Sequence, residues 1–429
     1  MNLRSTIIVR KEADRCLLYN GDNGALIDLS TLTYGSLFTR HCPPDPGLHE
    51  LCDWLRTSGF LDVDSEQPRK IESVGTEPVS DGFYDLRSQL NPYNVLWALT
   101  PRCNLRCVYC FPDAYSFSKT ADEPSRNALL SIAEQIIEAK VFKVTLTGGE
   151  AILSPFIWDI IERLRCAGLT VAVLTNGSPV NDQVVARLKG YGVCVGVSLD
   201  GPTDQVTRLT RGRGAFRRSV LAIMKLVNNS VPVSVLVVVT TYNFNSLREH
   251  VSFVRNLGAD AIILQDLRPF GTREIYNRTR LTATQENGLR QLFDQLRSDN
   301  PGFRIDPSEL FICSKKHSGD TVMPCPAGDN FVYIDFLGDV YPCTSLPSFK
   351  MGNVFAGESL TWLWRYSEAI HALRKIKEMR VEELPGCASC DNLSHCEGGC
   401  RGDALFHRGD LFGRPSRCPQ EIGLLGDRS

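Results

Sequence analysis

Three closely spaced cysteines have the spacing of an iron–sulfur site. Cys103, Cys107 and Cys110 form the run C-x3-C-x2-C, directly after an apolar stretch at 95–100. Because iron–sulfur clusters are bound mainly by cysteine thiolates, these three can hold three irons of a [4Fe–4S] cluster. The fourth iron is then open to a substrate or cofactor. Buried thiols or a zinc site are the alternatives, but a structural zinc ion normally takes four ligands, and no histidine stands near these cysteines.

This motif resembles the hallmark of the radical S-adenosylmethionine (SAM) enzymes, C-x3-C-x-aromatic-C, with Tyr109 at the aromatic position. The resemblance implies that the amino and carboxylate groups of SAM chelate the open iron. It also implies that reduction cleaves a C–S bond of SAM and that the 5′-deoxyadenosyl radical abstracts a hydrogen atom from the substrate. An electron donor such as flavodoxin or ferredoxin is the partner that this chemistry implies.

Length and composition indicate a soluble protein of two or three domains. The chain has 429 residues, of which 43% are hydrophobic and 22% charged. A net charge of −2 gives no basic excess that would favour nucleic acid or an anionic membrane as a partner. The N-terminal run lacks the apolar region of a signal peptide, so we expect a cytoplasmic protein.

Sixteen cysteines are many for a cytoplasmic chain of this length. In a reducing compartment, clustered cysteines more often indicate metal or redox chemistry than disulfides. Five lie outside the clusters, and we expect them to be small buried hydrophobic residues: Cys16, Cys42, Cys52, Cys166 and Cys194.

Strands and helices are predicted to alternate from Asn94 to Leu267, which indicates a parallel sheet with helical crossovers. The predicted strands are 95–100, 143–147, 170–175, 193–199, 233–240 and 261–267. The predicted helices are 125–139, 156–167, 182–191, 216–228 and 246–257. By resemblance this α/β region, 92–299, is a partial (β/α)6 TIM-type barrel, whose chemistry lies at the C-terminal ends of the strands.

Motifs at three of these strand ends match the SAM contacts of the family. The GGE motif after the second strand matches the family's contact to the SAM amino group. The turn Leu174-Thr175-Asn176-Gly177 follows the third strand. After the fourth strand, Ser198 and an arginine about ten residues later match further SAM contacts. We take Arg211 as that arginine, and Arg208 and Arg213 are the alternatives. Leu264, on the sixth predicted strand, packs either against the adenine of SAM or in the core. The cofactor-binding candidates are Tyr109, Gly148, Gly149, Glu150, Thr175, Asn176, Ser198, Asp200 and Arg211.

A second group of cysteines lies in the loop-rich region 300–429. It resembles the SPASM domain, which carries two auxiliary [4Fe–4S] clusters, in the pattern C-x12-G-x4-C, then C-x2-C-x5-C-x3-C, then C. By resemblance the first auxiliary cluster uses Cys313, Cys325, Cys343 and Cys400. The second uses Cys387, Cys390, Cys396 and Cys418. Cys313 lies upstream of the seven cysteines of this pattern, and paired zinc sites are the alternative.

Residues 1–66 form a separate unit, followed by a linker at 67–91. Short strands are predicted at 6–9, 16–19, 25–29 and 59–63, and helices at 31–41 and 47–58. This order resembles the small winged-helix-like peptide-recognition domain of ribosomal-peptide (RiPP) maturation enzymes. We expect a leader peptide to add to its exposed sheet edge. A plain capping domain is the alternative.

The combined resemblance favours an enzyme that oxidatively modifies a ribosomally made precursor peptide, by a C–C or thioether cross-link. A formylglycine-forming sulfatase maturase is an alternative, but Thr344 stands where those relatives have an aspartate base. A peptide epimerase and a non-catalytic peptide-binding homologue are the others. No catalytic acid or base is assigned, and the open candidates are Asp266, Arg268, Asp335 and Tyr341.

Overall fold

The computed structural model describes the strands of the first 62 residues with Leu55, and then 91–110, 123–268, 273–307, 327–379, 383–385, 387, 398–416 and 418. The chain divides into two compact units, Met1–Leu86 and Arg87–Ser429.

The first unit contains a three-stranded antiparallel sheet in the order β2-β3-β4. Its strands are β2 (Ile7–Lys11), β3 (Arg15–Asn20) and β4 (Leu26–Ser30), and a short pair joins β1 (Asn2–Leu3) to β5 (Leu61–Asp62). These strands confirm the predicted ones. The predicted helices, apart from Leu55, and the predicted linker, apart from Asn91, lie outside the described residues.

The second unit is built on one ten-stranded sheet in the order β12-β11-β10-β9-β8-β7-β6-β13-β14-β15. The six predicted barrel strands are confirmed as β6 (Asn94–Ala98), β7 (Lys143–Thr147), β8 (Thr170–Thr175), β9 (Cys194–Ser198), β10 (Val233–Val239) and β11 (Ala261–Asp266). They are parallel to one another. Runs rich in valine and leucine, as in β10, suit strands that are covered on both faces.

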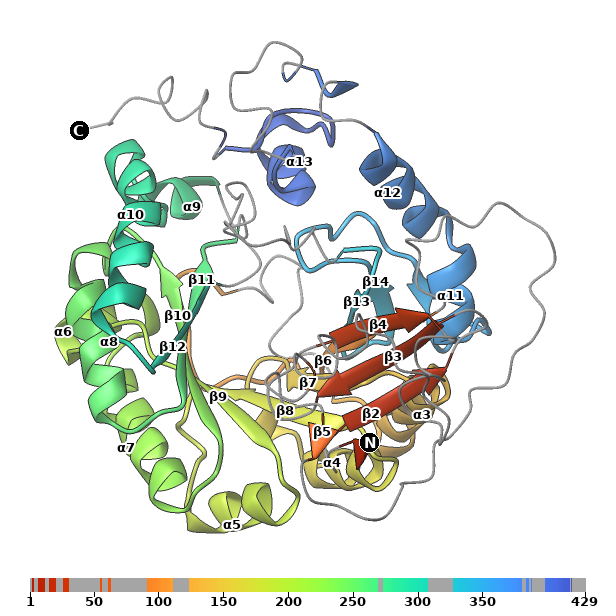
Figure 1. Cartoon of the computed structure of the whole chain (residues 1–429), viewed down its shortest axis with the longest axis horizontal. Coiled ribbons are helices and arrows are strands. Elements are labelled where there is room, and N and C mark those ends of the chain that lie inside the picture. Colours follow the sequence, from red (N-terminus) through yellow and green to blue (C-terminus); the bar gives the residue numbers. More distant parts are fainter. Residues whose placement is uncertain are drawn as a thin grey trace, which may run out of the picture. The chain divides into compact units, whose positions relative to one another are not determined.

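Helices follow the strands, and Figure 1 shows α5, α7 and α8 on the outer side of the curved sheet. The helical elements of the barrel are α3 (Arg126–Glu138), η2 (Ala151–Leu153), α4 (Ile157–Cys166), α5 (Asp182–Gly190), α6 (Asp204–Arg211), α7 (Ala215–Asn228), η3 (Phe244–Ser246), α8 (Leu247–Asn256), α9 (Arg273–Thr279) and α10 (Ala283–Asp299). Side chains of Ser125, Asn181 and Thr203 cap the N-termini of α3, α5 and α6, each worth about 1 kcal/mol. No helix in the described part of the chain is both long and apolar enough to cross a membrane.

The sheet continues beyond the six predicted strands on both sides. On one side β12 (Arg304–Pro307) pairs in parallel with β11. On the other, β13 (Phe331–Ile334) pairs in parallel with β6, and β14 (Asp339–Tyr341) and β15 (Gly352–Asn353) follow antiparallel. The C-terminal region also contains α11 (Leu360–Tyr366), α12 (Glu368–Glu378) and α13 (Arg401–Arg408).

One hydrophobic core joins the barrel to this extension. Val95 and Trp97 of β6 lie in the same buried cluster as Val332 of β13 and Trp364 of α11. The loop-rich composition of residues 300–429 did not indicate that β13, β14, α11 and α12 contribute side chains to the main core. The strand residues of β13 and β14 alternate onto the barrel core, which the local sequence pattern alone did not show.

The expectation that the scattered cysteines are buried is also wrong for Cys166, which is exposed. It is the last residue of α4, outside the stripe of Ile157, Ile160 and Leu164 that faces the core. Cys194 is partly buried, and burial raises the pKa of its thiol. The side chains of the other three scattered cysteines lie outside the described residues.

Candidate active site

The cysteine loop, residues 101–110, follows β6 at the C-terminal edge of the parallel strands. Its first part is held by the segment after β7, because Glu150 donates its backbone N–H to the Arg102 carbonyl at 2.7 Å. Its last part is held by α6, because Val108 donates its N–H to the Thr210 carbonyl at 2.9 Å. The loop that carries the three cysteines is thus fixed at both ends by backbone hydrogen bonds.

The two glycines of the GGE motif allow this contact. A Cβ on Gly148 would lie 2.6 Å from the Thr100 carbonyl oxygen, and one on Gly149 would lie 2.1 Å from the Arg102 carbonyl oxygen. Gly148 also has φ +139°, which side chains rarely adopt. The close approach that these two glycines allow is to the backbone of the cysteine loop and of Thr100 just before it.

The Glu150 carboxylate is buried between the ends of β7 and β8. It accepts hydrogen bonds from Thr175 Oγ1 at 2.8 Å, from the Asn176 N–H at 2.7 Å and from the Ile152 N–H at 3.3 Å. Burial raises the pKa of Glu150 to about 7, although these hydrogen bonds oppose the rise. A buried carboxylate in this position is suited to accept hydrogen bonds from an ammonium group.

The end of β8 also contacts the cysteine loop. Asn176 Nδ2 donates to Asn104 Oδ1 at 2.9 Å and points to Cys103 Sγ at 4.0 Å. Asn104 in turn donates to Ser178 Oγ at 2.6 Å, and the Leu105 N–H points to Cys103 Sγ at 3.4 Å. Two N–H donors therefore face the Cys103 sulfur, which suits a thiolate ligand.

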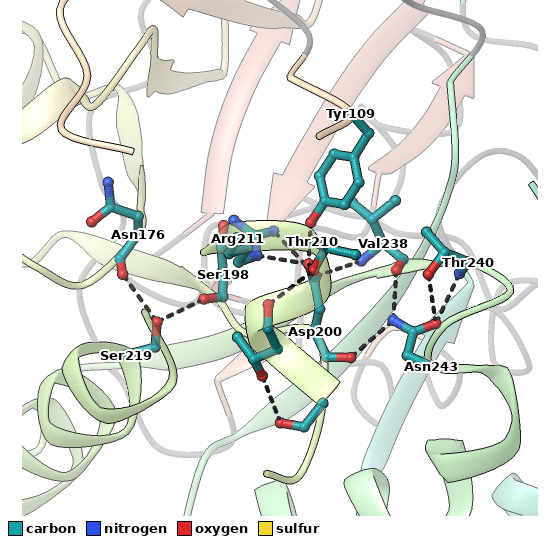
Figure 2. Close-up of polar contacts among 12 residues, drawn as sticks. Tyr109, Asn176, Ser198, Asp200, Thr210, Arg211, Ser219, Val238, Thr240 and Asn243 are labelled. Atoms are coloured by element: carbon teal, nitrogen blue, oxygen red, sulfur yellow. Dashed lines mark hydrogen bonds and ion pairs between the residues drawn. The ribbon is translucent and has the colours of Figure 1, made fainter. Parts of the chain in front are cut away.

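The fully buried Asp200 carboxylate, after β9, collects donors from three segments (Figure 2). Oδ2 accepts from Tyr109 of the cysteine loop, from Thr210 Oγ1 at 2.6 Å and from Arg211 Nε at 2.8 Å. Oδ1 accepts from Arg211 Nη2 at 3.2 Å and from the Val238 N–H at 3.2 Å. We call these five residues the Asp200 network.

Electrostatics keep the Asp200 network in one charge state. Burial raises the pKa of Tyr109 well above its usual value, so the phenol stays a donor. Burial works to lower the pKa of Arg211, but nearby negative charge, chiefly that of Asp200, reverses this and raises it. The Arg211 guanidinium also lies 5.6 Å from the Tyr109 ring centroid, within cation–π range. Arg208 and Arg213, the two competitors of Arg211, are exposed.

Ser219 of α7 links the ends of β8 and β9. Its hydroxyl lies 3.0 Å from both the Asn176 and the Ser198 carbonyl oxygens (Figure 2). Ser198, expected to contact SAM, is partly buried at the end of β9. Leu264 is fully buried in the main core, which supports the core alternative for this residue.

Sequence reasoning missed Asn243, whose side chain is hydrogen-bonded to the backbone of Asp200. Its Nδ2 donates to the Asp200 and Val238 carbonyl oxygens, each at 2.8 Å, while its Oδ1 accepts from the Thr240 N–H at 2.8 Å (Figure 2). The available signal was an asparagine four residues past the end of β10, at the edge where the chemistry was expected.

His250 of α8 lies close enough to Asp200 to feel its charge. The side chain is fully buried, and neither ring nitrogen has a hydrogen-bond partner among the described residues. Burial lowers the pKa of His250 to about 4, against the opposing effect of the Asp200 carboxylate. The imidazole is therefore neutral at ordinary pH.

The C-terminal cysteines that the structure describes are Cys343, Cys387, Cys400 and Cys418. Cys313, Cys325, Cys390 and Cys396 lie outside the described residues. Burial raises the pKa of the Cys400 thiol; the charge of Arg268 opposes this rise, and the charge of Cys343 adds to it. The Ser345 N–H points to Cys343 Sγ at 3.3 Å, as the N–H donors do at Cys103.

Within the described segments, no three His, Cys, Asp or Glu side chains converge in a way that would hold a metal ion. In an iron–sulfur cluster each thiolate binds its own iron, so the cysteines of the loop need not converge on one point. The half-buried thiols, with N–H donors on Cys103, fit ligands of such a cluster.

Two of the remaining candidates have structural surroundings. Asp335 Oδ1 accepts from the Leu337 and Asp339 N–H groups, both at 2.9 Å, in the turn between β13 and β14. Burial raises the pKa of Asp335 to about 7. The Tyr341 ring packs in a tilted arrangement against Tyr333 of the same hairpin, with ring centroids 5.9 Å apart. Thr344 is buried beside Cys343.

Comparisons with known proteins agree with this geometry. Residues 97–254 match the radical SAM superfamily, and residues 325–391 match SPASM, the iron–sulfur cluster-binding domain. Mycofactocin maturase MftC of Mycobacterium tuberculosis is 30% identical over 336 residues, which are 77% of this chain and 83% of that protein. The antilisterial bacteriocin subtilosin biosynthesis protein AlbA of Bacillus subtilis is 27% identical and covers 75% of this chain and 70% of its own length.

A solved structure extends the similarity of fold. Streptococcus suis SuiB bound to its precursor peptide SuiA superimposes with a TM-score of 0.70 at 16% identity, covering 97% of this chain and 99% of that chain. The cysteine loop at the strand ends, both matched domains and the MftC relatives lead to one conclusion: the chain belongs to the radical SAM superfamily and carries a C-terminal SPASM domain.

Proposed function

We propose that this chain is a peptide maturase. It abstracts a hydrogen atom from a ribosomally synthesised precursor peptide and forms an oxidative C–C or thioether cross-link. The observation that carries this proposal is the complete cysteine loop, anchored to β7, β8 and α6, in a chain whose relatives include a mycofactocin maturase and a bacteriocin biosynthesis protein. SuiB, the similar structure, is bound to a precursor peptide.

The family's cofactors are [4Fe–4S] clusters and SAM. When bound, they supply a carbon radical, formed by one-electron reduction, that abstracts hydrogen from the substrate. Cys103, Cys107 and Cys110 would hold three irons of the cluster and leave the fourth for SAM. Glu150 would accept hydrogen bonds from the SAM amino group.

Two further residues orient SAM beside this loop. Ser198, at the end of β9, and Arg211 would contact bound SAM. Arg211 directs Nε and Nη2 to the Asp200 carboxylate, so Nη1 is the guanidinium nitrogen that would serve this contact. Tyr109 fixes the loop through Asp200 and so holds the cysteines in register with these contacts.

The N-terminal unit is proposed to bind the leader of the precursor peptide. In its described sheet β3 is central, so β2 and β4 each keep one edge to which an extended peptide could add as a strand. Deleting residues 1–66 should weaken peptide binding and leave SAM cleavage intact, because the barrel belongs to a separate compact unit. Unchanged peptide affinity would remove the recognition role.

We propose flavodoxin or ferredoxin as the electron donor and the cytoplasm as the compartment, where thiols stay reduced and available to iron. The other functions weighed above are a formylglycine-forming maturase, an epimerase and a non-catalytic homologue. The intact cysteine loop and GGE motif argue against the last, and Thr344 argues against the first.

The deciding experiment uses the small peptide encoded beside this gene. It is incubated anaerobically with reconstituted enzyme, SAM and reductant, and its intact mass is recorded. A loss of two hydrogen atoms supports the oxidative cross-link, and fragmentation locates the bond. An unchanged mass with 5′-deoxyadenosine formed, together with deuterium uptake from heavy water, would replace the cross-link by epimerisation.

A further inference from the structure

Arg268 extends from the barrel towards the C-terminal cysteines. It follows β11, the sixth barrel strand, at the same edge of the sheet as the cysteine loop. Its Nη1 donates to Ser345 Oγ at 3.0 Å. Ser345 stands two residues after Cys343 and directs its own N–H to Cys343 Sγ at 3.3 Å. One arginine of the barrel therefore holds the turn that presents Cys343.

The same turn lies against the start of α13, where Cys400 is the residue before the helix. A Cβ on Gly402 would lie 2.5 Å from the Ser345 carbonyl oxygen, so only glycine lets the helix approach this closely. Cys343 and Cys400, which are far apart in the sequence, are brought together by this contact between the turn and the helix.

The positive charge of Arg268 lies at the turn of Cys343, because Arg268 Nη1 donates to Ser345 Oγ and the Ser345 N–H points to Cys343 Sγ. Since an arginine side chain stays protonated at any ordinary pH, its positive charge is permanent. Net charge and hydrogen bonds around the sulfurs are among the features that set the reduction potential of an iron–sulfur cluster.

We propose that Arg268 is a positioning and tuning residue of the auxiliary cluster that Cys343 and Cys400 share. Its hydrogen bond to Ser345 fixes the Cys343 turn, and its charge favours the reduced cluster, which carries one more electron. The proposal rests on the proposed function, because it takes these two cysteines as ligands of one cluster. It ties the potential of that cluster to the barrel strand that borders the radical chemistry.

The test compares full-length Arg268→Gln and Arg268→Lys with the wild type after anaerobic reconstitution. Iron content and EPR-monitored reduction potentials are measured for each. In R268Q we expect the reduced-to-oxidised ratio of one auxiliary cluster at a fixed potential to fall about tenfold, which is about 59 mV for a one-electron couple. R268K keeps the charge and should shift less. The SAM-binding cluster should not change in either variant.

Two further variants separate charge from general damage. Ser345→Ala removes the hydrogen-bond acceptor of Arg268 and keeps its charge, so its shift should be smaller than that of R268Q. Arg248→Gln is the matched control, because Arg248 pairs with Asp299 on the exposed surface of α8 and α10. This control should leave every potential at the wild-type value.

Each outcome bears on the proposal. R268Q with full iron content and wild-type potentials overturns it. Loss of about four irons from R268Q but not from R268K supports it, since the charge is then needed to hold one cluster. Loss from both variants, with S345A unchanged in potential, overturns it. A wild-type protein with only about four irons per chain would instead refute the auxiliary clusters of the proposed function.

Discussion

The two cysteine sites of this protein are supported in different ways. In the barrel, three cysteines lie within one short loop that is anchored by backbone hydrogen bonds, by Asn176 and by the buried Asp200 network. At the C-terminal site, Cys343 and Cys400 come from distant segments joined by the contact of Gly402 with Ser345 and by Arg268. At the first site the polypeptide itself supplies many of the contacts that position the cysteines.

The difference has a physical cause. Parallel strands end at one edge of the sheet, so a loop after β6 can draw partners from β7, β8 and β9 without any metal. Turns and a short helix have fewer backbone donors to offer one another, and there metal binding contributes more of the folding free energy. We therefore expect changes in the barrel to act on SAM chemistry and changes in the C-terminal site to act on the fate of the peptide.

The largest effect should come from removing one ligand of each site. Cys107→Ala should abolish reductive cleavage of SAM, because the cluster loses a thiolate beside its open iron. Cys400→Ala should leave SAM cleavage in place and lose the cross-linked peptide. Liquid chromatography of 5′-deoxyadenosine measures SAM cleavage, and mass spectrometry of the peptide measures the cross-linked product. Full 5′-deoxyadenosine formation in C107A would remove the barrel assignment, and a normal peptide product from C400A would make the C-terminal site merely structural.

The next effect concerns the support of the barrel site. Asp200→Asn leaves the Arg211 guanidinium buried without its charge partner, which typically costs about 3–5 kcal/mol of unfolding free energy. Urea unfolding of the reconstituted protein measures this cost. Asp299→Asn is the control, because its pair with Arg248 is half exposed and should contribute less than about 1 kcal/mol. Equal losses in the two variants would show that the Asp200 network does not support the site.

The sequence predicted the barrel better than it predicted the supports of the site. Strands such as β7 and β8 are apolar runs whose period and bounds are local, so their ends matched the structure closely. Helix α6 was missed because its sequence is short and polar, with Asp204 and Arg208 exposed. The parallel pairing of β13 with β6 was missed because long-range pairing leaves no local pattern.

The roles of the site residues show the same limit. The structure has Glu150 and Asp200 after the ends of β7 and β9 and Arg211 at the end of α6, but a motif does not say whether a residue faces a ligand or another part of the chain. In the structure the glycines of GGE contact the cysteine loop, and Arg211 pairs with Asp200. Asn243 carried no motif at all, and only the folded geometry places it under Asp200.

A smaller effect is the free energy of unfolding that is lost because His250 is buried as a neutral side chain near the barrel site. His250 is neutral in the folded protein with a pKa of about 4, whereas an unfolded histidine titrates near 6.5. Between these values the unfolded state binds more protons, so stability falls as the pH falls. From pH 7.5 to pH 5 this histidine should cost about 2 kcal/mol. His250→Leu should lose that part of the pH dependence.

Thermal unfolding of wild type and H250L at both pH values measures this difference. Glu150 and Asp335 have raised pKa values, so between about pH 4 and 7 they make the folded protein more stable as the pH falls. Both proteins contain these two residues, so the difference in stability between wild type and H250L removes their contribution. A constant difference between H250L and wild type at the two pH values would mean that His250 is not held neutral. The C-terminal site has no described counterpart to this buried imidazole.

The smallest effect isolates the one side chain that ties the cysteine loop to the Asp200 network. Tyr109→Phe removes a hydrogen bond to a charged group and keeps the ring over Arg211, and such bonds contribute about 1.5–3 kcal/mol. Asp200 keeps its bonds from Thr210, Arg211 and Val238, so we expect the lower end of that range. The loop should then hold SAM less well, which raises the KM for SAM more than it lowers kcat.

Tyr366→Phe is the matched control, because the Tyr366 side chain is exposed on α11, and it should change neither KM nor stability. An unchanged KM and unchanged stability in Y109F would mean that backbone hydrogen bonds alone position the cysteine loop, and the contrast between the two sites would then rest on the backbone of the barrel rather than on its buried charges.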